Sequence, residues 1–139
     1  MALILKHLPE TSEHRAPILA GYRKMMAELL RLQKPDGLWA QLVNEPEVWS
    51  ETSGSAMFAS ALATGAKLGW LDAAEYGAAA RRAYLGLLKH LDKHGNIDEV
   101  CMGTGTHDDH DFYLARPRKV GDAHGQAALM WTVNALLIK

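Results

Sequence analysis

The stretch WSETSGSAMFASALATGAKLGW, residues 49–70, decides how this chain folds. Its beginning is small and polar, and almost everything after it is small or apolar. From about residue 53 to residue 68 it carries one charge, Lys67, in the last turn, where a cation suits the helix dipole. A helix without a polar face must be buried on all sides. The sequence therefore predicts a central helix, whose polar first turn either faces a pocket or only caps the helix.

Three further helices are predicted around this one. Residues 13–33 place apolar side chains on one face, with Ser12 as a plausible N-cap and the Pro-Asp-Gly turn at 35–37 as the stop. Residues 74–91 are amphipathic in the same way, whereas residues 123–138 contain no Asp, Glu, Lys or Arg until the chain end. Half-exposed and wholly apolar helices therefore alternate along the chain.

An internal repeat supports this alternation. LLRLQKPDGLWAQLV at 29–43 aligns with LLKHLDKHGNIDEVC at 87–101, and each contains an amphipathic helix end, a Gly turn and a short strand-like run. After each comes a loop and then a buried helix, which begins with Ser53-Gly54-Ser55 in one unit and His124-Gly125-Gln126 in the other. The repeating unit is a helical hairpin, and the pattern predicts an all-α toroid in which outer helices surround inner ones. Inner helices of a toroid begin at one rim, where their free N–H groups and positive dipole ends face the central hole.

Two hairpins do not close such a ring, since a helical toroid of this kind needs about six. We therefore expect residues 1–139 to form a single partial (α/α)-barrel domain. Both apolar helices would otherwise leave one flank open to water, forming a larger apolar patch than monomers usually expose.

Composition narrows the classes of function. The chain has 139 residues, a net charge of −1 and 22% charged residues, so no cationic excess favours nucleic acid. One cysteine permits no internal disulfide, and no apolar run is long enough to cross a bilayer. The start MALILKHLPE lacks the basic segment of a signal peptide. We expect a cytoplasmic protein with no nucleic-acid or membrane partner.

Three segments carry a family resemblance: DGLWAQLVNEPEVWSETSGSAMFASALATGAKLGWL, VCMGTGTHDDHDFYLARP and GDAHGQAALMWTVNALL. With ETSGSAMF, GTGT, YLARP and HGQ in this order, the chain resembles the C-terminal part of the unsaturated glucuronyl and rhamnogalacturonyl hydrolases. These are the six-hairpin glycosidases of the glycoside hydrolase 88/105 group. The resemblance implies an (α/α)6 toroid, of which this chain would supply about two hairpins without the N-terminal half.

The resemblance also implies a reaction. The family removes the 4,5-unsaturated uronic acid that polysaccharide lyases leave on pectin-type or glycosaminoglycan oligosaccharides. An Asp acts as general acid and base and delivers a proton to C4, water adds at C5, and the hemiketal opens. No metal or cofactor is implied.

The catalytic Asp of the family and an Arg-Gly-Asn-Gly-Trp stretch belong to a part that no segment of this chain matches. We therefore assign the catalytic role to no Asp here. General acid catalysis contributes about 10²- to 10⁴-fold in rate, so the chain alone is expected to be inactive. The missing wall of the ring would come from the other half-barrel or from a second copy.

Two other classes stay open beside this enzyme fragment. One is a non-catalytic carbohydrate-binding or half-barrel assembly module. The other is a six-hairpin sugar isomerase or epimerase, which would need His residues on facing inner helices, where only His124 stands.

An anionic sugar calls for a guanidinium, an aromatic plate and hydroxyl partners. Arg116 in YLARP is the first candidate for the carboxylate, and Tyr113 is a candidate partner for a sugar hydroxyl. His124 begins a buried helix, whose positive dipole end favours a neutral imidazole as hydrogen-bond partner. Thr52 and Ser53 line the other helix mouth.

Aromatic and acidic residues complete the candidates. Glu51 lies beside the first helix mouth, and Trp39 and Trp49 flank the same loop, where each either stacks on a pyranose ring or is buried for its area alone. The run THDDHDF at 106–112 could offer imidazole and carboxylate ligands to a metal, but it matches no calcium or zinc spacing. A solvated loop is the favoured interpretation of that run.

Overall fold

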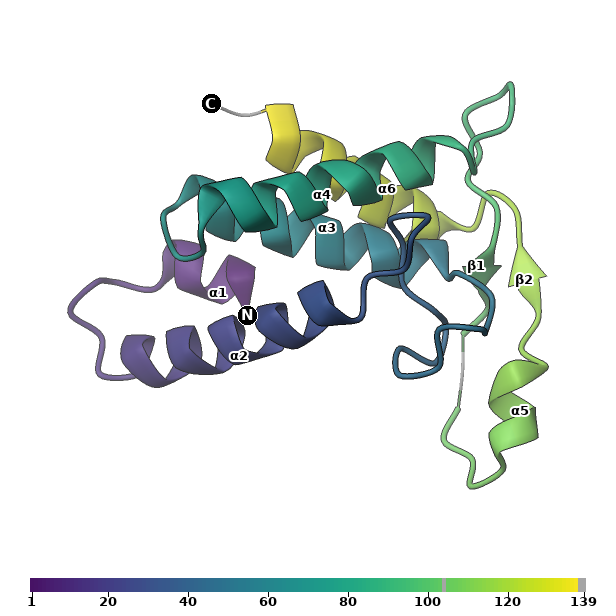
Figure 1. The fold of residues 1–139 in the computed structure, drawn as a ribbon, viewed down its shortest axis with the longest axis horizontal. Helices are drawn as coiled ribbons and strands as arrows, with labels where there is room; N and C mark the ends of the chain where they lie inside the picture. The colour runs from purple at the N-terminus through teal and green to yellow at the C-terminus, as the bar shows by residue number, and fades with distance from the viewer. Residues whose placement is uncertain (104, 138–139) are drawn as a thin grey trace.

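A computed structural model describes residues 1–103 and 105–137. The helices and strands are α1 (Ala2–His7), α2 (Arg15–Arg31), α3 (Thr52–Lys67), α4 (Ala73–Leu88), β1 (Val100–Cys101), α5 (His110–Leu114), β2 (Arg118–Lys119) and α6 (Ala123–Leu137). In Figure 1, α3 lies between α2, α4 and α6, and the β1–β2 ribbon crosses one end of the bundle. The all-α architecture predicted from the helix alternation is confirmed, and no helix of the described residues meets the length and hydropathy of a membrane span.

The four predicted helices are present as α2, α3, α4 and α6, whereas α1 and α5 were not predicted. The Ser12 prediction is wrong, because α2 has His14 as its N-cap and no side-chain cap. The Ser12 hydroxyl instead accepts a hydrogen bond from the His14 amide, 3.3 Å away, in the turn before the helix. Short helices such as α1 carry too few turns for periodicity to reveal them.

Helix α3 is the inner helix of the first hairpin. Its small side chains let α4 and α6 approach closely, so that Ala56, Ala59, Leu62 and Ala63 are all buried. Glycine is required at position 65, where an added Cβ would run into the Tyr22 hydroxyl and Leu71. The small-residue composition of this stretch is thus a packing requirement.

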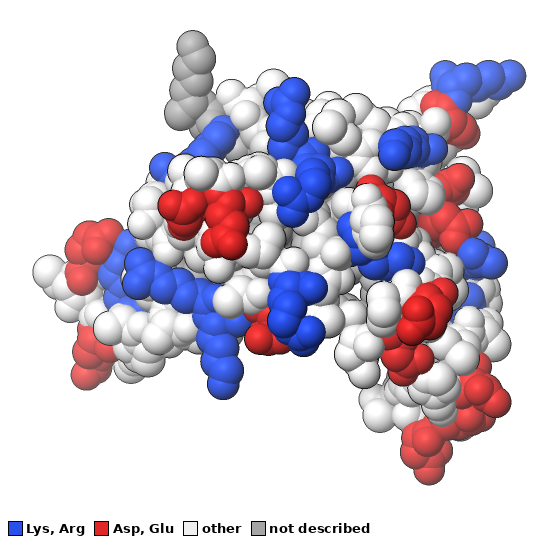
Figure 2. Space-filling view, in the orientation of Figure 1, with Lys and Arg blue, Asp and Glu red and all other residues white. Residues whose placement is uncertain are grey.

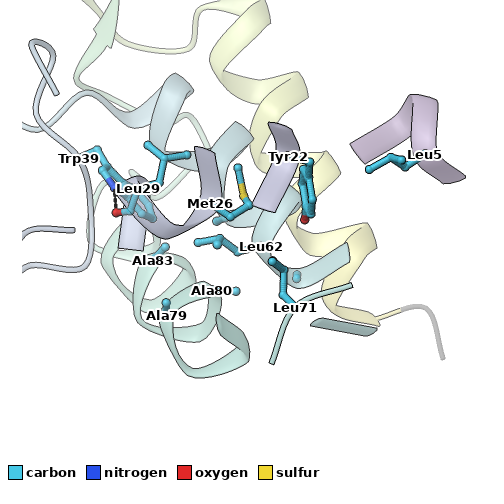
Figure 3. Close-up of a cluster of buried hydrophobic side chains, with 12 residues drawn as sticks. Leu5, Tyr22, Met26, Leu29, Trp39, Leu62, Leu71, Ala79, Ala80 and Ala83 are labelled. Atoms are coloured by element: carbon cyan, nitrogen blue, oxygen red, sulfur yellow. Dashed lines mark hydrogen bonds between the residues drawn. The ribbon is translucent and has the colours of Figure 1, made fainter. Parts of the chain in front are cut away.

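The main core lies where α2, α3 and α4 meet (Figure 3). Tyr22 is fully buried there and its hydroxyl donates to the Ala61 carbonyl, 2.7 Å away; burial raises the pKa of this phenol. Trp39 is 1% exposed, and its indole N–H donates to the Leu29 carbonyl at 2.7 Å. Of the two interpretations of Trp39, the structure supports burial and excludes stacking on a bound sugar.

The internal repeat is confirmed by matching turns. The amide of Gly37 donates to the Lys34 carbonyl at 2.9 Å, and the amide of Gly95 donates to the Asp92 carbonyl at 3.0 Å. Both glycines have positive φ, +90° and +80°, which side chains rarely allow. The two outer helices therefore end in the same turn geometry.

The units also share the contact between the turn and the inner helix. The Trp39 amide donates to the Ser55 hydroxyl at 2.9 Å, and the Ile97 amide donates to the Gln126 side-chain oxygen at 2.8 Å. In each unit the third residue of the aligned first-turn triplet holds the extended run that follows the glycine turn. The alignment of Ser53-Gly54-Ser55 with His124-Gly125-Gln126 is therefore a structural equivalence.

Helix α6 departs from the prediction of complete burial. Met130, Trp131 and Leu137 are 66%, 51% and 75% exposed, and on α3 Met57 is 40% exposed. The physical reason is that α6 packs mainly on α3, while the described residues supply no further outer helix to cover its other flank. This is the open flank expected of an incomplete ring.

Candidate functional site

Both inner helices begin at the end of the bundle crossed by the β1–β2 ribbon (Figure 1). Strand β1 pairs with β2 in antiparallel register, with Val100 opposite Lys119 and Cys101 opposite Arg118. The Thr52 amide, at the start of α3, donates to the Glu99 carbonyl just before β1, 3.1 Å away. The helix starts and the ribbon therefore form one rim, as the toroid prediction requires.

The mouth of α3 is occupied by the chain's own carboxylate. Glu51 is the N-cap, is 9% exposed, and accepts from the amides of Ser53 at 3.0 Å and Gly54 at 2.6 Å. It also accepts from the Cys101 amide at 3.0 Å, which ties β1 to the helix. The positive end of this helix is thus neutralised internally.

The predicted site residues Thr52 and Ser53 are buried and use their hydroxyl protons inside the fold. The Ser53 hydroxyl donates to Glu51 at 2.7 Å, and the Thr52 hydroxyl donates to the Asp98 carbonyl at 2.6 Å. The cavity beside this mouth measures about 80 Å³, well below the roughly 300–1,000 Å³ of ligand pockets. This geometry favours the capping interpretation of the first turn, while sugar contact by either residue stays a prediction.

The mouth of α6 is more open. The His124 side chain is 43% exposed, and its Nδ1 lies 2.6 Å from a carboxylate oxygen of Asp122. The hydrogen bond from the His124 amide is the largest cause that holds the pKa of Asp122 below its usual range, and Lys119, 3.2 Å away, adds to it. His124 therefore presents a partly exposed imidazole at the mouth of α6.

Trp49 lies on the rim beside residues that the sequence did not single out. The Arg118 guanidinium sits 5.2 Å from the Trp49 ring centroid, in cation–π geometry, and it pairs with the Glu99 carboxylate at 2.7 Å. Glu99 has a positive φ of 54°, which is uncommon for this residue type. A sugar that stacks on Trp49 must use the ring area that Arg118 leaves open. No sequence pattern singled out Arg118, whose position depends on the pairing of β1 with β2.

Arg116 and Tyr113 belong to an arm, residues 105–117, that projects from the ribbon beyond the helices (Figure 1). The Tyr113 hydroxyl donates to the His107 carbonyl and accepts from the His107 amide, both at 2.8 Å. Arg116 donates to the Gly103 carbonyl at 2.7 Å and lies 4.8 Å from the Phe112 ring centroid. Its Nε is buried and, within the described part of the chain, has no hydrogen-bond partner.

The tip of the arm is acidic, as Figure 2 shows at the lower right. His110 lies 2.9 Å from Glu45 of the loop after the first glycine turn, and this hydrogen bond raises the pKa of His110 above its ordinary value. Asp109 caps α5 by accepting from the Asp111 amide at 3.0 Å. No group of three or more metal-binding side chains gathers among residues 1–103 and 105–137. The contacts of the THDDHDF run are those of an exposed loop with structural hydrogen bonds.

The rim therefore brings the predicted residues together only in part. Thr52 and Trp49 are linked through the ion pair of Glu99 and Arg118. Ser53 follows Thr52 in the first turn of α3, and His124 stands at the second helix mouth. In the described ranges, no hydrogen bond or ion pair joins Arg116 or Tyr113 of the arm to these residues.

The sequence profile of Glycosyl Hydrolase Family 88 matches residues 1–137. The chain belongs to this family. It is 32% identical over 102 residues to an unsaturated 3S-rhamnoglycuronyl hydrolase of Formosa agariphila, covering 72% of this chain and 27% of that protein. It is 29% identical over 118 residues to the unsaturated rhamnogalacturonyl hydrolase YesR of Bacillus subtilis, covering 84% and 32%.

The fold agrees with this membership. A solved structure described as a possible GH105 member from Salmonella enterica superposes with a TM-score of 0.89 at 27% identity, over 96% of this chain and 35% of that one. The resemblance to the 88/105 group and the toroid fold are thereby confirmed. This Family 88 chain spans about a third of the length of these relatives.

Proposed function

We propose that this Family 88 chain is part of a glycoside hydrolase that removes 4,5-unsaturated uronic acid from lyase-generated oligosaccharides. The family match over residues 1–137 is the observation that carries the proposal. In this reaction an acid protonates C4 of the enol ether and water adds at C5, after which the hemiketal opens. The acid comes from the rest of the toroid, since we assign that role to no Asp of this chain, so the chain acts only within a completed ring.

The role of this chain is to line one part of the sugar site. Arg116 is the group that would bind the uronate carboxylate, because a guanidinium can donate two parallel hydrogen bonds to a carboxylate. The exposed imidazole of His124 and the hydroxyl of Tyr113 are partners for sugar hydroxyls. Trp49, partly exposed beside Arg118, offers an aromatic face to the ring.

Thr52 and Ser53 have a supporting role in this proposal. Their hydroxyl protons are directed to Asp98 and Glu51, so that only their oxygen lone pairs are left for a ligand. We propose that they support the rim by fixing β1 on α3, with any sugar contact made through an accepting oxygen.

An NMR titration with an unsaturated uronyl disaccharide tests the sugar site. We expect shifts of the Arg116 side-chain and His124 ring resonances, with no loss of the ultraviolet absorbance of the C4=C5 bond. Arg116→Lys should weaken binding roughly tenfold, because lysine loses the forked geometry of the guanidinium. Arg82→Lys is the matched control, since the Arg82 guanidinium donates to the side chain of Gln33, which is not part of the proposed sugar site.

The outcomes separate the candidate functions. Turnover by the isolated chain would contradict the assignment of the acid to the rest of the ring. Binding without turnover fits both an incomplete enzyme and a non-catalytic carbohydrate-binding module. The carbohydrate-binding module is kept as the second candidate because this chain spans only 27% and 32% of the length of the two hydrolases above. No shift at Arg116 or His124 at millimolar sugar would refute the site.

A further inference from the structure

An acidic residue with an uncommon backbone conformation lies at the rim, directly before β1. Glu99 is the one non-glycine residue with a positive φ among residues 1–103 and 105–137. The internal repeat aligns Glu99 with Gln41, which follows the equivalent glycine turn without a positive φ. The hairpin unit therefore does not require this conformation, and a strained backbone that the fold does not require points to a role for the side chain.

Hydrogen bonds from two elements hold the backbone around Glu99. The Glu99 carbonyl accepts from the Thr52 amide at 3.1 Å, and the Asp98 carbonyl accepts from the Thr52 hydroxyl at 2.6 Å. On the other side, the Asp98 amide donates to the His90 carbonyl at 3.0 Å, and the Asp98 carboxylate lies 2.7 Å from the His90 imidazole. The inner helix α3 and the turn after α4 thus fix the direction in which Glu99 leaves the chain.

The fixed carboxylate in turn positions a guanidinium. Nη1 of Arg118 donates to Oε2 of Glu99 at 2.7 Å, and the guanidinium carbon lies 5.2 Å from the centroid of the Trp49 ring. The side chains of Arg118 and Glu99 are 49% and 31% exposed. Among the described residues, Oε1 of Glu99 and the other Arg118 donors form no hydrogen bond, and none of these atoms is buried. The pair therefore presents an acceptor and a donor side by side on an aromatic support.

We infer that Glu99 and Arg118 form a second sugar subsite, which binds two neighbouring hydroxyls of an uncharged sugar next to the uronate. One hydroxyl donates to Oε1 of Glu99, and the other accepts from Arg118. The inference rests on the proposed function, in which Arg116 binds the uronate. Arg116 and Arg118 are two residues apart, at most about 7 Å between their Cα atoms, so neighbouring units of one oligosaccharide can reach both.

Charge compensation is the reason for expecting an uncharged sugar. The charge of Arg118 is matched by Glu99, 2.7 Å away, so a sulfate or carboxylate on this sugar would lie beside the Glu99 carboxylate and be repelled. Arg116 differs, because its recorded hydrogen bond goes to a backbone carbonyl and, in the described part of the chain, no acidic side chain pairs with it. The two arginines therefore suit different groups of one ligand.

The experiment is an NMR titration of the chain with two unsaturated uronyl disaccharides. In one, the second sugar is a neutral hexose with two adjacent free hydroxyls; in the other, one of these hydroxyls carries a sulfate. We expect the wild-type chain to bind the neutral disaccharide roughly tenfold more tightly. Glu99→Gln should abolish or invert this preference, because Arg118 then keeps an uncompensated charge. Glu28→Gln is the matched control, since Glu28 pairs with Arg31 at 2.9 Å within α2.

A second readout does not depend on a variant. The indole N–H resonance of Trp49 should shift when the neutral disaccharide binds, because Arg118 lies on this ring. The inference is overturned by an unshifted Trp49 resonance, by equal wild-type affinity for the two disaccharides, or by a preference that Glu99→Gln leaves as Glu28→Gln does. Unchanged far-ultraviolet circular dichroism shows that the variants are folded.

The Arg116 variant distinguishes this inference from the proposed function. Arg116→Lys should weaken both disaccharides to the same extent and leave the preference intact. If Arg116→Lys has no effect while the preference depends on Glu99, the uronate site fails and the second subsite stands. The reverse result overturns the second subsite alone, and no binding of either disaccharide at millimolar concentration overturns both.

Discussion

Replacing Glu51 with alanine should destabilise the protein by about 2.5–4 kcal/mol. The N-cap of α3 accounts for about 1 kcal/mol of this, because the Ser53 and Gly54 amides lose their acceptor. The remainder comes from the hydrogen bond of the Cys101 amide to the same partly buried carboxylate, since bonds to charged acceptors contribute about 1.5–3 kcal/mol. Urea denaturation followed by far-ultraviolet circular dichroism measures the free energy of unfolding.

Asp72→Ala is the control that separates the contribution of the Cys101 hydrogen bond from that of the N-cap. Asp72 caps α4 and its side chain accepts from the Glu75 amide at 2.8 Å, an exposed bond within one helix turn. Its loss should cost about 1 kcal/mol. The reasoning is refuted if Glu51→Ala costs no more than Asp72→Ala, because the tie between α3 and β1 would then contribute nothing. Glu51→Gln should fall between the two, since the amide nitrogen cannot accept from Gly54.

Three further predictions concern packing and charge. Gly86→Ala should destabilise the protein by about 1–3 kcal/mol, because the added Cβ would lie 2.6 Å from a backbone carbonyl oxygen, whereas Gly77→Ala in the same helix meets nothing closer than 4.0 Å and should stabilise it by about 0.5–1 kcal/mol. Thermal unfolding compares the two variants, and equal effects would contradict this account of the packing. The pKa of His110, measured by NMR, should lie above the ordinary value for histidine, and Glu45→Gln should lower it, because the hydrogen bond to Glu45 raises it. Since the folded pKa is raised, the contact stabilises the arm fully below the unfolded pKa, and this stabilisation is lost as the pH rises through the folded pKa. Thr132→Val should cost about 1 kcal/mol in urea unfolding, because the buried hydroxyl donates to an α3 carbonyl at 2.6 Å, and an unchanged midpoint would mean that this bond adds nothing.

Much of the fold could be predicted from the sequence because the repeat shows at several levels. The helix periodicity, the glycine turns and the small polar first turns agree with one another, and each has a separate physical cause. Gly37 and Gly95 are needed for positive φ, which only the turn geometry demands. The order of outer and inner helices followed from charge alone, since α3 carries one charge and α6 none.

The rest depended on contacts that sequence spacing does not encode. The six-residue α1 is held by Leu5, which is buried, and by Arg15, whose guanidinium donates to the carbonyls of Leu5 and Leu8. The local hydrophobic pattern does not predict these hydrogen bonds, which join residues ten and seven positions apart. The same holds for Arg118, whose place above Trp49 follows from the register of a two-residue strand pair.

The polar first turns are explained by the strand runs that cross the helix mouths. At the second mouth, a Cβ on Gly125 would lie 2.5 Å from a Val100 methyl, so only glycine allows β1 to pass this closely. At the first, a Cβ on Gly54 would lie 3.0 Å from the capping carboxylate of Glu51. The first turns are therefore small where an extended segment passes close to the helix, and polar where an amide of that segment needs an acceptor. Ser55 accepts from the Trp39 amide, and Gln126 accepts from the Ile97 amide. Specificity for a sugar is then expected from the arm and from His124, whose side chains are free of this packing requirement, and substitutions there should alter binding with little effect on stability.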